Sequence, residues 1–166
     1  MAKKEDFTPE EWNKLLQSVV LTGMAVSAAD PNGLWGTIKE AAAGRAAIAA
    51  SKRDANINEL IKAVIADFEA PKSRQAILES LHRCVAGCQP AEVVQRSLET
   101  LREVSVILDT KAPQNANAFK DWLRVVGQKV AEASKEGSIA GFGGVKISDA
   151  ETATLADISK ALNSPA

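Results

Sequence analysis

The spacing of its apolar residues constrains the fold of this chain more than any other feature of the sequence. Between residues 57 and 68 they recur every three or four positions, which is the period of a helix with one buried face. The set is Ile57, Leu60, Ile61, Val64, Ile65 and Phe68. No segment alternates between apolar and polar residues for long enough to predict a strand. The sequence therefore predicts an all-α protein.

Capping and turn residues divide the chain into about seven helices. Two pairs of residues have the spacing of a capping box, which marks the first turn of a helix. They are Thr8 with Glu11, and Ser148 with Glu151. Phe7 and Trp12 flank the first pair at the positions of a hydrophobic staple. We expect helices over residues 9–29, 34–50, 56–70, 73–86, 91–108, 118–136 and 148–162. Between the fifth and sixth helices we expect a linker over residues 109–117 that can keep partial helix.

The composition limits the classes of partner. Charged residues make up 25% of the 166 positions, apolar residues make up 46%, and the formal net charge is -1. This balance and this length suit one compact globular domain over residues 1–166. The charges form no basic stripe, so we expect no nucleic-acid partner. The longest weakly polar run, residues 19–29, is shorter than the ~20 residues that cross a membrane, so we expect no direct membrane insertion. Two cysteines without a secretory leader indicate a cytoplasmic protein.

One set of small and apolar residues occurs twice at a constant offset. Gly23, Val26, Ala29 and Gly33 are matched by Gly127, Val130, Ala133 and Gly137. In both copies a helical stretch breaks into a polar turn that another helical stretch follows. We therefore expect a pseudo-duplicated helix-turn-helix core, with repeats around residues 9–50 and 118–163.

The first of these turns carries oxygen ligands for a hard cation. Asp30 and Asn32 stand two residues apart, as ligands do at the start of a calcium loop. Gly33 comes too early in the loop for an EF-hand. Ala41, the residue after Glu40, occupies the position of the bidentate glutamate. A looser site for calcium or magnesium at Asp30, Asn32 and Glu40 remains open beside simple turn chemistry. The comparable oxygens of the second copy belong to Glu136, Asp149 and Glu151, for which the alternative is helix capping.

Cys84 and Cys88 stand one helical turn apart, and His82 precedes them. The imidazole would lie about 200° around the helix from Cys84, so the three groups do not converge on a metal. Two interpretations stay open. The cysteines are small core residues on the face of Ile77 and Leu81, or they form a redox pair of a thiol sensor at the helix end.

The sequence offers little for catalysis. It has no tyrosine and one histidine, and its glycine-rich stretch at residues 141–144 lacks the Gly-Lys-Ser/Thr sequence of a phosphate loop. We therefore expect a non-enzymatic protein that acts through a protein partner or as a homo-oligomer. The alanine-rich stretch at residues 41–47 suits either close helix packing or an oligomerisation surface.

The repeated helix-end pattern resembles the TerB-like family, named for tellurite-resistance protein B. The pattern covers residues 23–33 with Glu40, and then residues 127–137 with residues 147–151. This resemblance implies an all-helical fold with two similar halves and an acidic surface site for divalent cations. It assigns that site to Asp30, Glu40 and Glu151. It also implies an accessory role in tellurite or stress resistance, carried out through protein partners.

Overall fold

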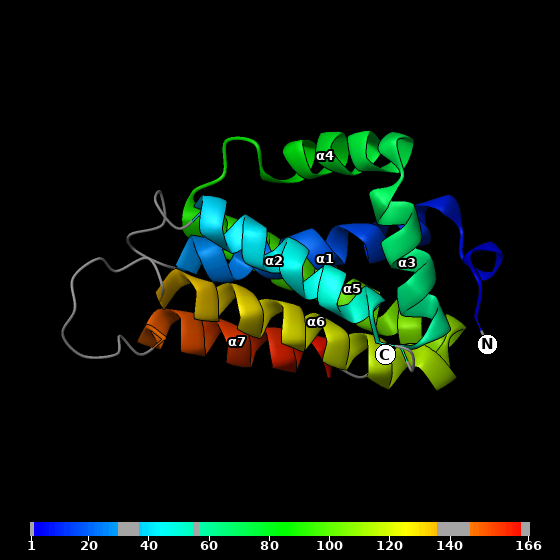
Figure 1. Cartoon of the computed structure of the whole chain (residues 1–166). Coiled ribbons are helices and arrows are strands. Elements are labelled where there is room, and N and C mark those ends of the chain that lie inside the picture. Colours follow the sequence, from blue (N-terminus) through cyan, green and yellow to red (C-terminus); the bar gives the residue numbers. More distant parts are fainter. Residues whose placement is uncertain (1, 30–36, 55–56, 136–146, 164–166) are drawn as a thin grey trace.

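The computed structural model of the chain describes residues 2–29, 37–54, 57–135 and 147–163, with side chains for all of these except residues 37–43 and 134–135. The described residues form seven α-helices and one short 3-10 helix, and they contain no strand. The all-α class is therefore confirmed. The helices are η1 (Lys4–Asp6), α1 (Pro9–Ala29), α2 (Thr37–Lys52), α3 (Glu59–Glu69), α4 (Pro71–Val85), α5 (Pro90–Lys111), α6 (Pro113–Lys135) and α7 (Asp149–Leu162) (Figure 1).

Helix α1 is the central element of the bundle. It packs most extensively against α5 and also contacts α6 and α7, while α2 packs on α6 and α5 packs on α7. Figure 1 shows α3 crossing the end of these long helices and α4 turning back over their outside. The inward side chains of the helices form one shared core. Its largest fully buried members include Leu15, Leu21, Leu60, Leu101, Leu108, Phe119 and Leu123.

The start of α1 is built as the sequence predicts. The backbone N–H of Thr8 donates to the Glu11 carboxylate at 2.7 Å, and the backbone N–H of Glu11 donates to Thr8 Oγ1 at 3.2 Å. The rings of Phe7 and Trp12 lie 5.7 Å apart between centroids and close the staple. The capping box and the staple are both confirmed, and so are the predicted bounds of this helix.

The predicted linker over residues 109–117 is wrong. Helix α5 continues to Lys111 and α6 begins at Pro113, so Ala112 alone separates them. Proline lacks a backbone N–H and has a fixed φ, and both properties suit the first position of a helix as well as a break. Asn115 and Ala116 are buried in the first turn of α6, which makes this connection part of the core.

The third helix starts later than predicted because Asn58 is its cap. The Asn58 side chain accepts a hydrogen bond from the backbone N–H of Leu60 at 2.9 Å. Its Oδ1 also accepts from the Asn115 amide at 2.8 Å. This contact ties the start of α3 to the first turn of α6.

Small residues allow α1, α2 and α6 to approach closely. A Cβ atom on Gly127 would lie 3.2 Å from Thr22 Cγ2, and one on Gly23 would lie 3.5 Å from Val130 Cγ2. Gly23 and Gly127, one matched pair of the two predicted repeats, thus lie where α1 and α6 meet, while the duplication itself stays a prediction. On α2, Ala47 is buried within the chain. For Ala47, the close-packing interpretation of the alanine-rich stretch is the right one.

Candidate functional site

The predicted cation site falls largely outside the described residues. Asp30 and Asn32 lie outside them, and of Glu40 the structure describes only its place in α2. Glu136 also lies outside the described ranges. Within the ranges that the structure describes, no three or more His, Cys, Asp or Glu side chains are grouped so that they could hold a metal ion.

Glu151 takes the capping role at the start of α7. Its side chain is buried, with the residue only 3% exposed. Its carboxylate accepts hydrogen bonds from the backbone N–H and the hydroxyl of Ser148, each at 2.9 Å, and its own N–H donates to Ser148 Oγ at 3.1 Å. The second predicted capping box is therefore confirmed.

The two cysteines lie at the edge of the core. Both are free and half-buried, whereas Ile77 and Leu81 on the same helix are fully buried. The Cys88 thiol donates to the backbone carbonyl of Cys84 at 3.8 Å, just beyond the end of α4. His82 is exposed on that helix. A redox role for Cys84 and Cys88 stays a prediction.

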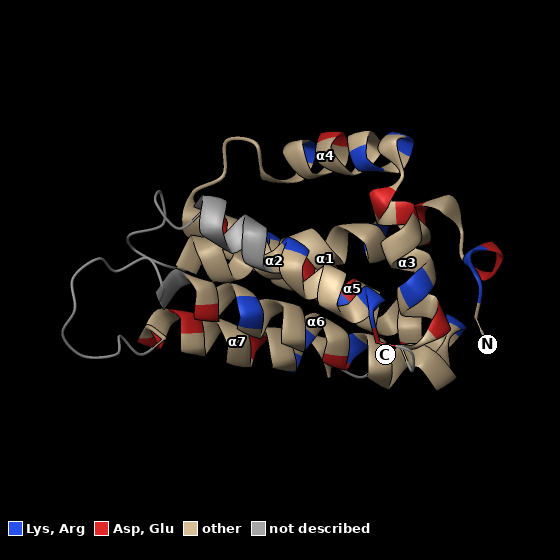
Figure 2. Ribbon diagram, viewed as in Figure 1, with Lys and Arg blue, Asp and Glu red and all other residues tan. Residues whose placement is uncertain are grey.

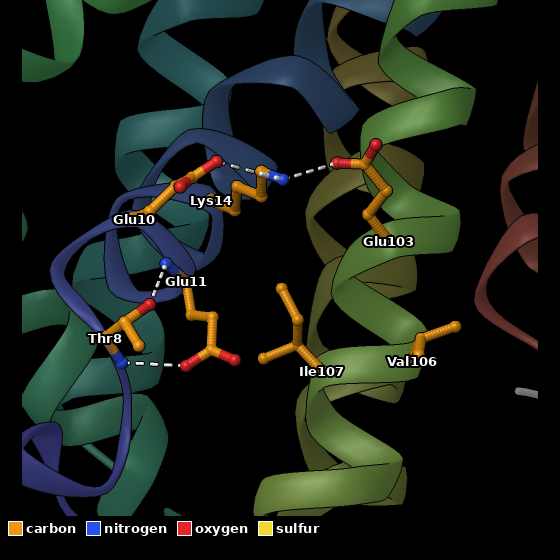
Figure 3. A pocket seen from close by; sticks show the side chains of 7 residues that line it. All are labelled: Thr8, Glu10, Glu11, Lys14, Glu103, Val106 and Ile107. Carbon is orange, nitrogen blue, oxygen red and sulfur yellow. Dashed lines mark hydrogen bonds and ion pairs between the residues drawn. The ribbon is translucent and has the colours of Figure 1, made fainter.

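A groove between α1 and α5 brings together residues from distant parts of the chain (Figure 3). We call it the α1–α5 groove. It is lined by Thr8, Glu10, Glu11, Lys14, Glu103, Val106 and Ile107. The acidic residues of α1 stand in its first turn, where carboxylates favour the helix dipole. The lining residues of α5 are Glu103, Val106 and Ile107, and because the last two follow Glu103 by three and four positions, all three share one face of the helix.

Three carboxylates line this groove, and two of them share the ammonium group of Lys14. Lys14 Nζ lies 3.0 Å from a Glu103 carboxylate oxygen and 3.7 Å from a Glu10 carboxylate oxygen. The hydrogen bond to Glu103 is the main reason that the pKa of Lys14 is raised. The Glu10 and Glu103 side chains are 83% and 55% exposed. Ion pairs this exposed contribute only about 0–1 kcal/mol, so they can open when another cation arrives.

Glu11 remains ionised inside the groove. The backbone N–H of Thr8 donates to its carboxylate, and this hydrogen bond is the main cause of its lowered pKa. Lys111 Nζ lies 3.9 Å from the same carboxylate. In Figure 3 the Glu11 and Ile107 side chains extend toward each other across the groove. An anionic group thus stands directly opposite an apolar wall.

Val106 gives the groove its exposed apolar surface. It is 38% exposed and is one of three large apolar residues with such exposure in the described part of the chain. The other two are Leu78 and Val125. Ile107 beside it is half-buried and packs against the core. This site was not predicted from the sequence, although an apolar residue on the polar side of α5, near Glu99, Arg102 and Glu103, was a signal for it.

The described lining of the groove consists of three carboxylates, one ammonium group, one hydroxyl and two apolar side chains. The hydroxyl, that of Thr8, accepts the capping hydrogen bond from the backbone N–H of Glu11.

The comparisons with known proteins give no relative. No family model, no curated protein and no solved structure matches the chain. The resemblance to the TerB-like family therefore stays a prediction. None of the helices that the described residues form is both long and apolar enough to cross a membrane.

Proposed function

We propose that this chain is a non-enzymatic accessory protein that binds a basic amphipathic segment of a partner protein in the α1–α5 groove. One observation carries the proposal. The exposed apolar side chain of Val106 lies on α5 beside Ile107, and Ile107 faces the Glu11 carboxylate of α1 (Figure 3). Small apolar patches with a charged border are typical of protein-binding surfaces.

The apolar and the charged residues of the groove contribute differently to binding of the partner segment. Full burial of a valine side chain contributes about 1.5 kcal/mol, whereas one exposed ion pair contributes about 0.2–1 kcal/mol. Contact with Val106 and Ile107 therefore supplies affinity. The charges supply selectivity, since in the described part of the chain the three carboxylates of the groove pair only with the ammonium groups of Lys14 and Lys111.

A partner lysine or arginine can enter without leaving a buried charge. Lys14 is shared between two carboxylates, and its distance to Glu10 is already 3.7 Å. An arriving cation can bind Glu10 while Lys14 keeps its 3.0 Å contact with Glu103. Both carboxylates are exposed, so the exchange costs little desolvation.

The proposal agrees with the mode of action that the TerB-like resemblance implies, which is action through protein partners. A role in tellurite or stress resistance extends that resemblance. Control of partner binding by calcium or magnesium at Asp30, Asn32 and Glu40 remains a separate prediction. The proposed groove site uses other residues, which lie near the start of α1 and on α5.

Two synthetic peptides of opposite charge test the proposed function. In the Lys–Leu peptide, a helix of ~15 residues, leucines recur at helical spacing among lysines and alanines. In the Glu–Leu peptide glutamates replace the lysines. Fluorescence anisotropy should show that Val106→Lys and Glu103→Lys each weaken binding of the Lys–Leu peptide by about tenfold or more.

The control variants carry the same substitutions on other faces. Val125→Lys alters an exposed valine of α6, and Asp157→Lys alters an exposed carboxylate of α7 that pairs with a lysine, as Glu103 does. Both should bind the Lys–Leu peptide as the unchanged chain does. Equal affinity of the groove variants and the control variants would overturn the proposal.

A further inference from the structure

Helix α4 is attached to the bundle by few buried side chains. Of its 15 residues only Ile77 and Leu81 are buried. Polar contacts complete the attachment, because Ser80 Oγ accepts hydrogen bonds from the Gln17 amide at 2.7 Å and the Asn13 amide at 3.4 Å. Figure 1 shows α4 lying across the outside of the long helices. Most of its surface therefore faces solvent.

The outward side of α4 is cationic. The helix carries Lys72, Arg74 and Arg83 against the single carboxylate of Glu79, and its basic positions stand out in Figure 2. Within the described part of the chain, none of these three cations forms an ion pair. Arg74 donates only to the backbone carbonyl of Glu69, at 3.4 Å. The helix thus presents charge that the rest of the described chain does not neutralise.

Leu78 lies within this cationic surface. It is 59% exposed, the highest exposure among the large apolar residues that the structure describes. Arg74, Leu78 and His82 follow one another at intervals of four and form one stripe of the helix. Leu78, His82 and Arg83 also line a shallow hollow together with Glu79. We call these residues, with Lys72, the α4 face.

Helix stability explains only part of the α4 face, because Arg83 in the last turn favours the helix dipole but the other residues of the face have no such role. A lysine in the first turn, such as Lys72, opposes the helix dipole and destabilises the helix slightly. Leu78 stays mostly exposed in the described part of the chain. Both residues would gain contacts if another surface covered them.

We propose that the α4 face is a second docking surface, which binds an acidic amphipathic helix of a partner protein. An apolar residue of that helix covers Leu78, while one of its carboxylates pairs with Arg83, which lines the same hollow. The charge of the surface selects an acidic occupant. This inference goes beyond the proposed function, because it uses different residues and predicts a partner segment of the opposite charge.

The observations favour a protein over other acidic surfaces. A helix that lies on a membrane needs a wide apolar side, and Leu78 is the only large apolar residue of α4 with high exposure. Binding to nucleic acid needs a row of phosphate contacts, whereas Glu79 interrupts the three cations of α4. An acidic amphipathic helix offers both an apolar residue to cover Leu78 and a carboxylate to pair with Arg83.

The Glu–Leu peptide is the probe for this surface. Leu78→Glu and Arg83→Glu should each weaken its binding by about tenfold or more in fluorescence anisotropy. Val125→Glu and Lys129→Glu make the same changes at exposed positions of α6 and should leave binding unchanged. Thermal melting of every variant checks that the fold is retained, which the exposure of all four positions predicts.

Crossing the two sets of variants separates the two proposals. The α4 variants should weaken only the Glu–Leu peptide, and Val106→Lys and Glu103→Lys should weaken only the Lys–Leu peptide. Unchanged binding of the Glu–Leu peptide to Leu78→Glu and Arg83→Glu would overturn the second docking surface alone. Tighter binding of duplex DNA, or of vesicles of anionic phospholipid, than of the Glu–Leu peptide would overturn the assignment to a protein partner.

Discussion

The indole N–H of Trp12 donates a hydrogen bond of 2.7 Å to the carboxylate of Asp67. The same carboxylate accepts from Lys4 Nζ at 2.7 Å and from Ser73 Oγ at 2.8 Å. One side chain near the end of α3 thus joins the N-terminal segment, α1 and α4. This junction holds the otherwise weakly attached α4 in place.

Replacing Asp67 with alanine should destabilise the protein by about 1–3 kcal/mol, because the partly buried indole N–H of Trp12 loses its acceptor. Urea unfolding followed by circular dichroism measures the change. Asp157→Ala is the matched control, since Asp157 pairs only with an exposed lysine on its own helix. Its effect should stay within about 0.5 kcal/mol, the usual range for surface sites. Equal losses in the two variants would contradict the structural role of Asp67.

Asp67 should also make stability depend on acidity. Burial raises the pKa of its carboxyl, but hydrogen bonds from Lys4, Trp12 and Ser73 outweigh burial and leave the pKa below 3.8. The folded state therefore binds the proton more weakly than the unfolded state does. The stabilisation is complete above the ordinary pKa and is lost as the pH falls through the lowered one.

Asp67→Asn removes this titration and provides the test. The free energy of unfolding of the unchanged chain should fall more steeply than that of Asp67→Asn as the pH drops below the ordinary pKa of 3.8. Urea unfolding at a series of acidic pH values measures both slopes. Parallel slopes would show that Asp67 contributes nothing to acid sensitivity.

Ser148 and Glu151 allow the capping role and the cation-binding role to be separated. Ser148→Ala removes the hydroxyl that caps α7 and should cost about 1 kcal/mol. If Glu151 acts only as the capping partner of Ser148 and binds no cation, the loss of stability should be the same in excess EDTA and in excess calcium. A loss that appears only with calcium would show that Glu151 acts as a cation ligand.

The sequence predicts best what local interactions decide. The start of α1 follows from Thr8 and Pro9, both of which act within a few residues. The linker prediction failed because Pro113 fits both a break and the first position of a helix. Asn115 and Ala116 are buried, and their burial favours a helix that begins at Pro113. That burial depends on the packing of the whole bundle, which no local pattern shows.

The candidate surfaces could not be predicted in the same way. The α1–α5 groove joins residues 8–14 to residues 103–107, and no local pattern indicates that these segments lie side by side. The exposure of Leu78 depends equally on where α4 packs. The spacing of Ile77, Leu78 and Leu81 predicts a helix, but it does not indicate how much of that helix the bundle covers.

Lys120 and Asp109 join α5 and α6 beside their short connection. The Lys120 side chain is 7% exposed, and its ammonium group lies 2.7 Å from both carboxylate oxygens of Asp109, whose side chain is 36% exposed. Asp109→Ala leaves the buried ammonium without its partner and should cost about 2–3 kcal/mol. Lys120→Met removes the charge but keeps the buried methylene groups, so it should cost less. Urea unfolding of the two variants measures the order, and a larger loss in Lys120→Met would contradict it.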